Sequence, residues 1–256
     1  MPQLKQLIGD TAVRAYHEPF LGGASAFLGL GPFDEAYLSD ANAELIETFL
    51  AIRDHPKRVA DLANSYSNDE DTYYEVRATA PSGKIASAAR FLFLNHTSFN
   101  GIYRVNLDGV YNVPFGQGRR TNIPTVEGLR AISARLQKAA LRVGDFEDCI
   151  NNVRAGDLVF LDPPYTVAHD NNGFIKYNQK LFSFEDQTRL SALIDAIKER
   201  KAHYILANAA HASIIELFDK GDRLIETSRR NAVGGAQAAR GSAREYLFTD
   251  LKEATG

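Results

Sequence analysis

The residues Asp162-Pro-Pro-Tyr165 carry the clearest chemical pattern in this sequence. They follow Leu158-Val-Phe-Leu161, an apolar run typical of a buried parallel strand, and proline ends such a strand because it supplies no N–H to the sheet. Ligand sites in open α/β sheets form just beyond the carboxyl ends of strands. We therefore expect Asp162 and Tyr165 at the edge of a ligand site.

The chemistry suited to these four residues is alkylation of an exocyclic amino group of a base. Such a nitrogen is a poor nucleophile because its lone pair is delocalised into the ring. A catalyst therefore has to accept hydrogen bonds from its N–H groups and draw it towards a tetrahedral form. Asp162 can accept one bond, the carbonyl of Pro163 can accept the other, and Tyr165 offers a flat face for the base. The alternative interpretation is a turn that only terminates a strand.

A pair of glycines stands where another predicted strand ends. Gly22 and Gly23 follow a short strand that ends near Phe20, and a backbone without Cβ atoms lets a ligand approach closely. The segment does not read G-x-G-x-x-G, so a dinucleotide-dependent oxidoreductase is poorly supported.

Two acids also stand at predicted strand ends. Asp40 ends the strand predicted over 36–40, where an acid bonds ribose hydroxyls in nucleoside-binding sheets, but it can equally cap the next helix. Asp145 ends the strand predicted over 141–145. It can bond an adenine amino group or cap the helix that begins near Phe146.

A β-hairpin is predicted between residues 103 and 113. Its turn is Asp108-Gly109, which lies between two short runs of strand-forming residues. Arginine and asparagine make paired hydrogen bonds to guanine and adenine edges, and exposed aromatic rings can stack on bases. The hairpin and the chain after it carry Arg104, Asn112 and Arg119. An ordinary hairpin whose asparagines serve turns is the alternative.

The chain order predicts an α/β fold with a mainly parallel sheet, because strands alternate with helices before residue 55 and after residue 139. Residues 56–139 lack strand runs apart from the hairpin and look like a mostly helical insertion. The expected parts are therefore 1–55, the insertion 56–139, and 140–256. The polar loop 166–183 is long enough to fold over a substrate.

Bulk properties are those of an ordinary soluble protein of 256 residues, 45% hydrophobic and 24% charged. No apolar run approaches the roughly 20 residues of a membrane span and no signal peptide opens the chain, so we expect a cytoplasmic protein. The single Cys149 excludes an intrachain disulfide, and six scattered histidines without H-E-x-x-H argue against a catalytic metal. A net charge of −3 argues against coating of nucleic acid by bulk attraction, although a local basic face remains compatible with it.

Four segments occur in an order that resembles a known family. They are Glu18-Pro-Phe-Leu-Gly-Gly23, Ser39-Asp-Ala-Asn42, the block from Phe99-Asn-Gly101 to Asn112-Val-Pro-Phe-Gly116, and Asp162-Pro-Pro-Tyr165. From about residue 16 to residue 249 the sequence resembles the Dam-like, alpha-group (D12 class) DNA adenine-N6 methyltransferases. The resemblance implies a Rossmann-like methyltransferase sheet with an inserted helical and β-hairpin target-recognition domain.

The same resemblance implies S-adenosylmethionine as cofactor. It places Asp40 at the cofactor ribose and Asp145 near its adenine ring. The implied cofactor residues are Glu18, Phe20, Gly22, Gly23, Asp40, Asp145, Phe146 and Asp162. Residues Asp162, Pro163, Pro164 and Tyr165 would hold a flipped adenine for direct methyl transfer to N6, without a covalent enzyme intermediate.

The implied partner is double-stranded DNA, with GATC as the expected site. Phe99 would stack into the gap that a flipped base leaves. The implied DNA contacts are Phe99, Asn100, Ile102, Arg104, Asn112, Pro114 and Arg119. We expect a monomer without a metal ion, and a cognate restriction enzyme is a candidate partner.

One departure from the family concerns the beginning of the chain. Family members usually open with a Trp-Ala-Gly-Gly-Lys-like segment that helps to close the cofactor site. Here 17 residues precede Glu18, the chain has no tryptophan, and no Gly-Gly-Lys occurs. Either the natural start lies upstream or part of the site is missing. The alternatives to an active DNA enzyme are therefore a truncated, inactive DNA-binding relative and an amino-methyltransferase that acts on another base or on RNA.

Overall fold

The computed structural model describes residues 1–106, 109–117, 123–164, 182–230 and 242–252. The contacts divide the chain into two compact units, one made of residues 1–41 and 144–256 and the other of residues 42–143. The second unit begins earlier than the predicted insertion, which was expected over 56–139. That this unit recognises DNA stays a prediction.

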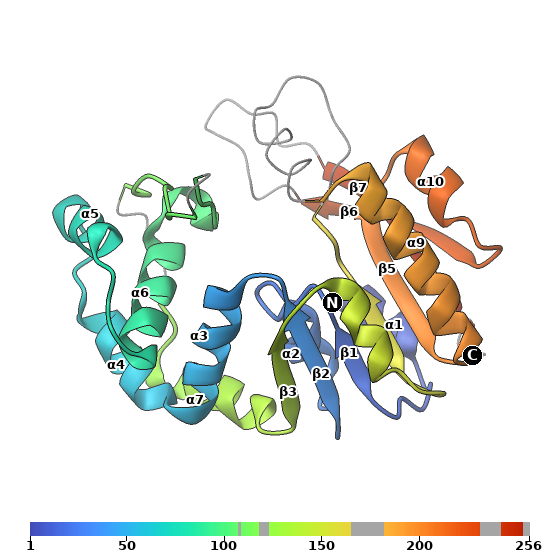
Figure 1. Ribbon diagram of the computed structural model, residues 1–256, viewed down its shortest axis with the longest axis horizontal. Helices are drawn as coiled ribbons and strands as arrows, with labels where there is room; N and C mark the ends of the chain where they lie inside the picture. The colour runs from blue at the N-terminus through green and yellow to red at the C-terminus, as the bar shows by residue number, and fades with distance from the viewer. Residues whose placement is uncertain (107–108, 118–122, 165–181, 231–241, 253–256) are drawn as a thin grey trace. The chain divides into compact units, whose positions relative to one another are not determined.

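The first unit alternates strands with helices (Figure 1). Its strands are β1 (Tyr16–Glu18), β2 (Ala36–Asp40), β4 (Leu158–Leu161), β5 (His203–Ala209), β6 (Arg223–Arg230) and β7 (Ser242–Thr249). Its helices are α1 (Pro2–Ile8), α2 (Ser25–Leu30), the 3-10 helix η2 (Phe146–Asn151), α9 (Phe184–Glu199) and α10 (Ala212–Phe218).

The strands of the first unit form a mostly parallel sheet. These strands stand in the order β2-β1-β4-β5-β7-β6. β1 runs parallel to β2 and β4, and β4 runs parallel to β5, whereas β7 is antiparallel to both of its neighbours. The prediction of an α/β fold with a mainly parallel sheet is confirmed.

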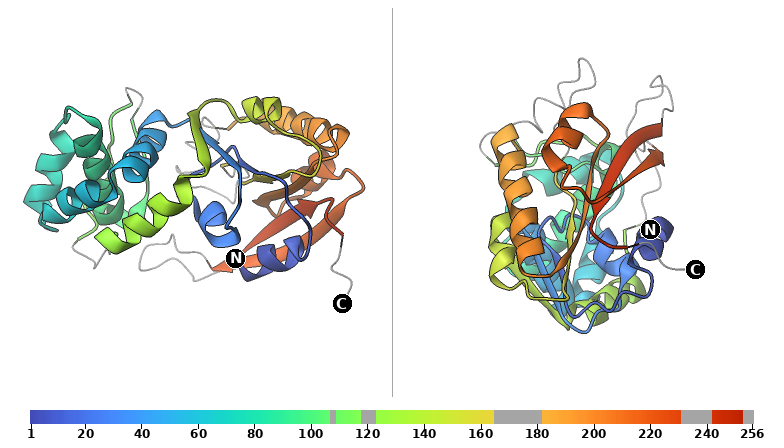
Figure 2. Two further views of the ribbon diagram at one scale, coloured as in Figure 1. Left: turned by 90° about the horizontal axis from the view of Figure 1, so that it is seen from below. Right: turned by 90° about the vertical axis from the view of Figure 1, so that its right-hand side faces the viewer.

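Strand β4 is buried on both faces, as its unbroken apolar sequence predicts. Val159 and Leu161 lie in a hydrophobic core with side chains of α9, whereas Phe160 lines a cavity. Alternate residues of a strand point to opposite faces of a sheet, which explains this division. In the right-hand view of Figure 2, α9 and α1 lie on opposite sides of the sheet.

The region before η2 differs from the prediction. The strand expected over 141–145 is β3 (Ala139–Val143), so Asp145 does not end a strand. Asp145 is instead the N-cap of η2, and its Oδ1 accepts a hydrogen bond from the Glu147 N–H at 3.0 Å. Capping is one of the two roles that the sequence left open for Asp145, because an N-terminal helical turn leaves backbone N–H groups without partners.

The second unit is mainly helical. Its elements are α3 (Ala43–Asp54), α4 (Pro56–Ser65), α5 (Glu70–Ala78), α6 (Lys84–Thr97), the 3-10 helix η1 (Phe99–Gly101), α7 (Val126–Leu136) and β3. Its core joins α5 and α6 to the segment 111–113, through side chains such as Tyr73, Phe93 and Tyr111.

The predicted hairpin is present in a short form: the Asn106 N–H donates to the Val110 carbonyl at 2.8 Å and the Asn112 N–H donates to the Arg104 carbonyl at 3.1 Å, on either side of an antiparallel bridge. The chain makes isolated bridges, Val105 with Tyr111 and Ser98 with Phe115, and the turn residues 107–108 lie outside the described part. Tyr111 is buried in the helical core, so this short hairpin packs against helices. Within the described ranges, no helix is both long and apolar enough to cross a membrane.

Candidate active site

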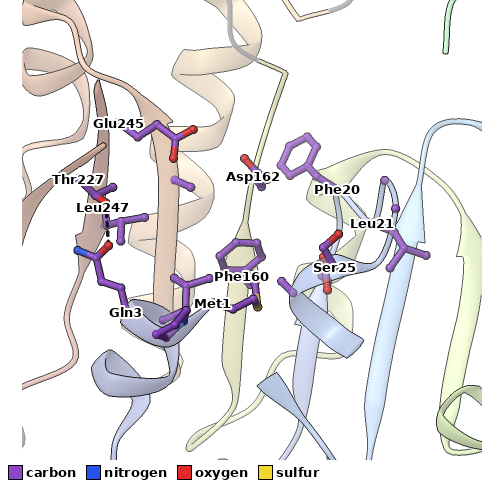
Figure 3. A pocket seen from close by; sticks show the side chains of 17 residues that line it. Met1, Gln3, Phe20, Leu21, Ser25, Phe160, Asp162, Thr227, Glu245 and Leu247 are labelled. Atoms are coloured by element: carbon purple, nitrogen blue, oxygen red, sulfur yellow. Dashed lines mark hydrogen bonds between the residues drawn. The ribbon is translucent and has the colours of Figure 1, made fainter. Parts of the chain in front are cut away.

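A cavity of about 680 Å³ lies beside the carboxyl ends of β1 and β4 (Figure 3). Its walls come from the first unit alone: the turn after β1, helices α1 and α2, and residues of β4, β5, β6 and β7. The lining residues are Met1, Pro2, Gln3, Leu4, Glu18, Phe20, Leu21, Gly22, Gly23, Ser25, Ala26, Phe160, Asp162, Ala207, Thr227, Glu245 and Leu247. Its volume lies in the range of small-molecule sites, about 300–1,000 Å³.

Glu18 is the buried acid of this cavity, with 2% of its surface exposed. Its Oε2 accepts hydrogen bonds from the Tyr16 hydroxyl at 2.8 Å and from the Phe27 backbone N–H at 3.0 Å. Burial raises the pKa of Glu18, the two hydrogen bonds oppose the rise, and the nearby charges of Asp162 and Asp40 add to it, so that the pKa is about 8. Glu18 is therefore mostly protonated at neutral pH.

The turn after β1 exposes its backbone to the cavity. Gly22 has a φ of +45°, in the left-handed region that glycine adopts without steric cost. Its N–H donates to Asp40 Oδ2 at 2.9 Å, and the Leu21 N–H donates to the Ser39 carbonyl at 3.0 Å. These bonds fix the turn to the end of β2 and place Asp40 next to the cavity.

The Asp-Pro-Pro turn begins where β4 ends. Asp162 is half-buried and lines the cavity, Pro163 is buried, and Pro164 is exposed. Figure 3 shows Asp162 near Phe20, which lies at the beginning of the turn after β1. Tyr165 and the predicted loop up to residue 181 lie outside the described residues, so the structure describes three of the four residues predicted to be catalytic.

Five of the eight predicted cofactor residues line the cavity, namely Glu18, Phe20, Gly22, Gly23 and Asp162. Asp40 adjoins it through the bond to Gly22. Asp145 and Phe146 are not among the lining residues. Asp145 pairs with Arg189, with 2.7 Å between Oδ1 and Nη2, and the Phe146 ring stacks on the Phe20 ring with centroids 5.2 Å apart.

In the second unit, one segment holds six of the seven predicted DNA contacts together. Phe99, 41% exposed, donates its N–H to the Pro114 carbonyl at 2.9 Å, and the Ile102 carbonyl accepts a bond from the Tyr111 hydroxyl. Asn100 has a φ of +57°, a conformation that asparagine tolerates better than most residues. The seventh residue, Arg119, lies outside the described part.

Arg104 is held by Asn112 within the same segment. Its Nε donates to Asn112 Oδ1 at 2.8 Å, and its Nη2 donates to the Asn112 carbonyl at 3.2 Å. Among the described residues, no hydrogen bond is made by Nη1, so the Nη1 edge of the guanidinium faces no partner in this part of the chain. An edge of this kind can bind the O6 and N7 atoms of guanine.

Some cavity residues were not predicted from the sequence. Gln3 and Thr227 line the cavity, and the Thr227 hydroxyl donates to Gln3 Oε1 at 2.7 Å (Figure 3). Glu245 adds a third carboxylate to the lining. The alternation of residues in β7 could have placed Glu245 and Leu247 on one face, but it does not show that this face meets α1.

A mostly parallel sheet with a cavity and an Asp-Pro-Pro turn at its carboxyl edge is the arrangement in which open α/β folds hold their ligand sites. Residues 1–232 match the model of the D12 class N6 adenine-specific DNA methyltransferase family. The chain belongs to this family and is therefore an adenine-specific DNA methyltransferase.

Named relatives agree with this assignment. The chain is 30% identical over 261 residues to the Type II methyltransferase M1.LlaDCHI of Lactococcus lactis subsp. cremoris, covering 98% of this chain and 90% of the relative. It is 32% identical to the DNA N-6-adenine-methyltransferase of Escherichia phage P1, covering 96% of this chain but only 32% of that longer protein. It is 27% identical to the DNA adenine methylase of Escherichia coli K12, covering 75% of this chain and 70% of the relative.

The two glycines of the turn after β1 should differ in their tolerance of a side chain. Gly22→Ala is expected to lower the free energy of unfolding by about 1 kcal/mol, because alanine is strained at positive φ although a Cβ would meet no atom within 4 Å. Gly23→Ala is the matched control, since its φ is ordinary and its Cβ would lie 3.8 Å from Ser25 Oγ. Denaturant unfolding measures both. Equal stability of the two variants would contradict the conformational explanation.

Proposed function

We propose that the cavity binds S-adenosylmethionine. The residues present suit this cofactor: the glycine turn leaves the backbone accessible, and the lining acids Glu18, Asp162 and Glu245 suit a ligand that carries sulfonium and ammonium charges. When bound, the cofactor supplies an electrophilic methyl group on its sulfonium sulfur. Phe20, Gly22 and Gly23 are proposed for the methionine side, Asp40 for the ribose, and Asp145 and Phe146 for the adenine side.

We propose that the reaction is methyl transfer to N6 of an adenine flipped out of duplex DNA. Asp162 accepts a hydrogen bond from one N–H of N6, and the Pro163 carbonyl accepts a hydrogen bond from the other. These bonds draw the amino nitrogen towards a tetrahedral, more nucleophilic form. Asp162 would accept the proton that N6 must lose when it gains the methyl group, whose bond to the sulfonium sulfur would break in the same step. Tyr165 is proposed to stack on the base, and Pro164 to keep the turn rigid.

The second unit is proposed to recognise the target sequence. The support is the segment 99–114, in which backbone bonds gather six candidate contacts and Asn112 holds Arg104. Arg119 is proposed as a further contact. GATC is the proposed site because these residue types and spacings resemble family members that modify that sequence. A monomeric state and a restriction partner stay predictions.

The observation that carries the proposal is the position of Asp162 in the cavity of a chain that belongs to the D12 class. The test is transfer of labelled methyl from S-adenosylmethionine to duplexes with and without GATC, followed by nucleoside analysis. We expect N6-methyladenine in the GATC duplex only. Label at another sequence would refute the site, label on cytosine or RNA would refute the substrate, and no label from S-adenosylmethionine would refute the enzyme proposal.

Asp162→Ala is expected to reduce methyl transfer at least 100-fold, because the N6 amino group loses its charged acceptor. DNA binding should stay within about threefold, since Asp162 lies in the first unit. Asp195→Ala, which removes an exposed acid paired with Lys220, is the control that should keep full activity. Single-turnover transfer and filter binding measure the two properties. Wild-type transfer rates in Asp162→Ala would exclude the proposed role.

Arg104→Ala is expected to cost about 1–3 kcal/mol at one guanine of the site and to relax specificity there. Arg77→Ala is the matched control, because Arg77 Nη1 donates to the Val113 carbonyl in the same segment without a proposed base contact. Transfer rates on duplexes that are substituted at each position of the site measure the effect. A uniform loss across all sequences would identify Arg104 as a phosphate contact instead.

Affinity for S-adenosylmethionine should rise as the pH increases towards 8. The folded-state pKa of Glu18 is raised to about 8, so at pH 7 the acid is protonated, and a bound cation favours its charged form. Because binding then releases a proton, the Kd falls by at most about tenfold for each unit by which the pH rises, as long as the pH is below that pKa. Glu18→Gln removes this dependence and is the control for the ligand's own titration. Calorimetry between pH 6.5 and 8.5 measures both proteins, and identical slopes would contradict the prediction.

A further inference from the structure

Arg189 of α9 binds three acids from two elements. Its guanidinium pairs with Asp145 at 2.7 Å and with Glu147 at 2.5 Å, both at η2, and with Asp186 at 2.8 Å on its own helix. The Arg189 Nε also donates to Glu147 Oε2 at 3.0 Å. A planar group with five donors is suited to joining several carboxylates at fixed angles, which a lysine cannot do.

The same guanidinium connects to the cavity wall through aromatic rings. Its Cζ lies 4.8 Å from the centre of the Phe146 ring, a cation–π distance. Phe146 stacks on Phe20 with ring centroids 5.2 Å apart, and Phe182 packs against both rings at 5.6 Å. Phe20 lines the cavity, whereas Arg189 does not.

We propose that Arg189 is a positioning residue of the cofactor site, which acts through Phe146 on Phe20 and through the ion pair on Asp145. This inference rests on the proposed binding of S-adenosylmethionine in the cavity. Arg189 holds residues 145–147 against α9, so that the Phe146 ring supports the wall that Phe20 presents to the ligand. Asp145, Glu147 and the Phe146 ring all contact the same guanidinium, so its removal frees residues 145–147 from α9.

A purely structural role would have a different signature. The Arg189 side chain is 35% exposed, and its three acids are 26–47% exposed, so the separate ion pairs contribute little to global stability. Loss of the guanidinium should therefore affect the position of Phe146 and Phe20 more than the unfolding of the protein. The expected result is a higher KM for the cofactor at nearly unchanged kcat and thermal stability.

The test compares Arg189→Met with Lys198→Met, a control on the same helix. Lys198 has a similar exposure of 32% and pairs with Asp222, and neither residue lines the cavity. Arg189→Met is expected to raise the KM for S-adenosylmethionine on the order of tenfold, with kcat on duplex DNA within about twofold. Lys198→Met should leave the KM unchanged, and Arg189→Lys should recover part of the loss.

An unchanged KM in Arg189→Met, or the same rise in Lys198→Met, overturns the positioning role. If Arg189→Met does not fold, Glu147→Gln serves instead, because it weakens the contacts of Arg189 with η2 while Asp145 and Asp186 stay in place, and an unchanged KM in that variant overturns the inference. Calorimetric binding of S-adenosylmethionine to the wild type separates the two proposals. Absence of wild-type binding refutes the proposed function, whereas wild-type binding with unaffected variants refutes only the role of Arg189.

Discussion

Parallel pairing of β1 with β4 is the interaction on which the rest of the site depends. Tyr16 lies opposite Leu158 and His17 lies opposite Val159, so two strands that are about 140 residues apart in the chain run side by side and end at the same edge. Glu18 ends one of them and Asp162 follows the other, and both line one cavity. A shift by one residue in this register would turn the side chains of either strand to the opposite face.

The site gathers acids that each need compensation. Glu18 is buried and shares a cavity with Asp162 and Glu245, while no lysine or arginine occurs among the described lining residues. Burial of a carboxylate without a cation is costly, so Glu18 holds its proton and uses the Tyr16 hydroxyl and the Phe27 N–H as partners. Acids further out are paired instead, as Asp145 is with Arg189.

The sequence alone predicts the parts of the fold and the site that local residue patterns determine. The apolar run before Asp162, the glycines after β1 and the strand that ends at Asp40 are all local signals, and the sheet edge brings them together because parallel strands share a carboxyl edge. It does not predict the contacts that depend on packing between elements far apart in the chain. Arg189 meets Asp145 only because α9 packs against η2, and the predicted hairpin packs against helices because Tyr111 is buried in their core. Gln3 and Glu245 line the cavity through contacts that no local periodicity contains.

The division of the chain has a consequence for how the protein is made. The second unit is one continuous stretch, residues 42–143, and can form its contacts as soon as that stretch has left the ribosome. The first unit cannot complete its sheet until β4 and β5 are synthesised, because β1 must wait for partners far along the chain. Such long-range pairing raises the contact order and slows folding. The part of the site that holds Glu18 and the glycine turn is thus synthesised early, but it reaches its final structure only after β4 and β5 have been synthesised.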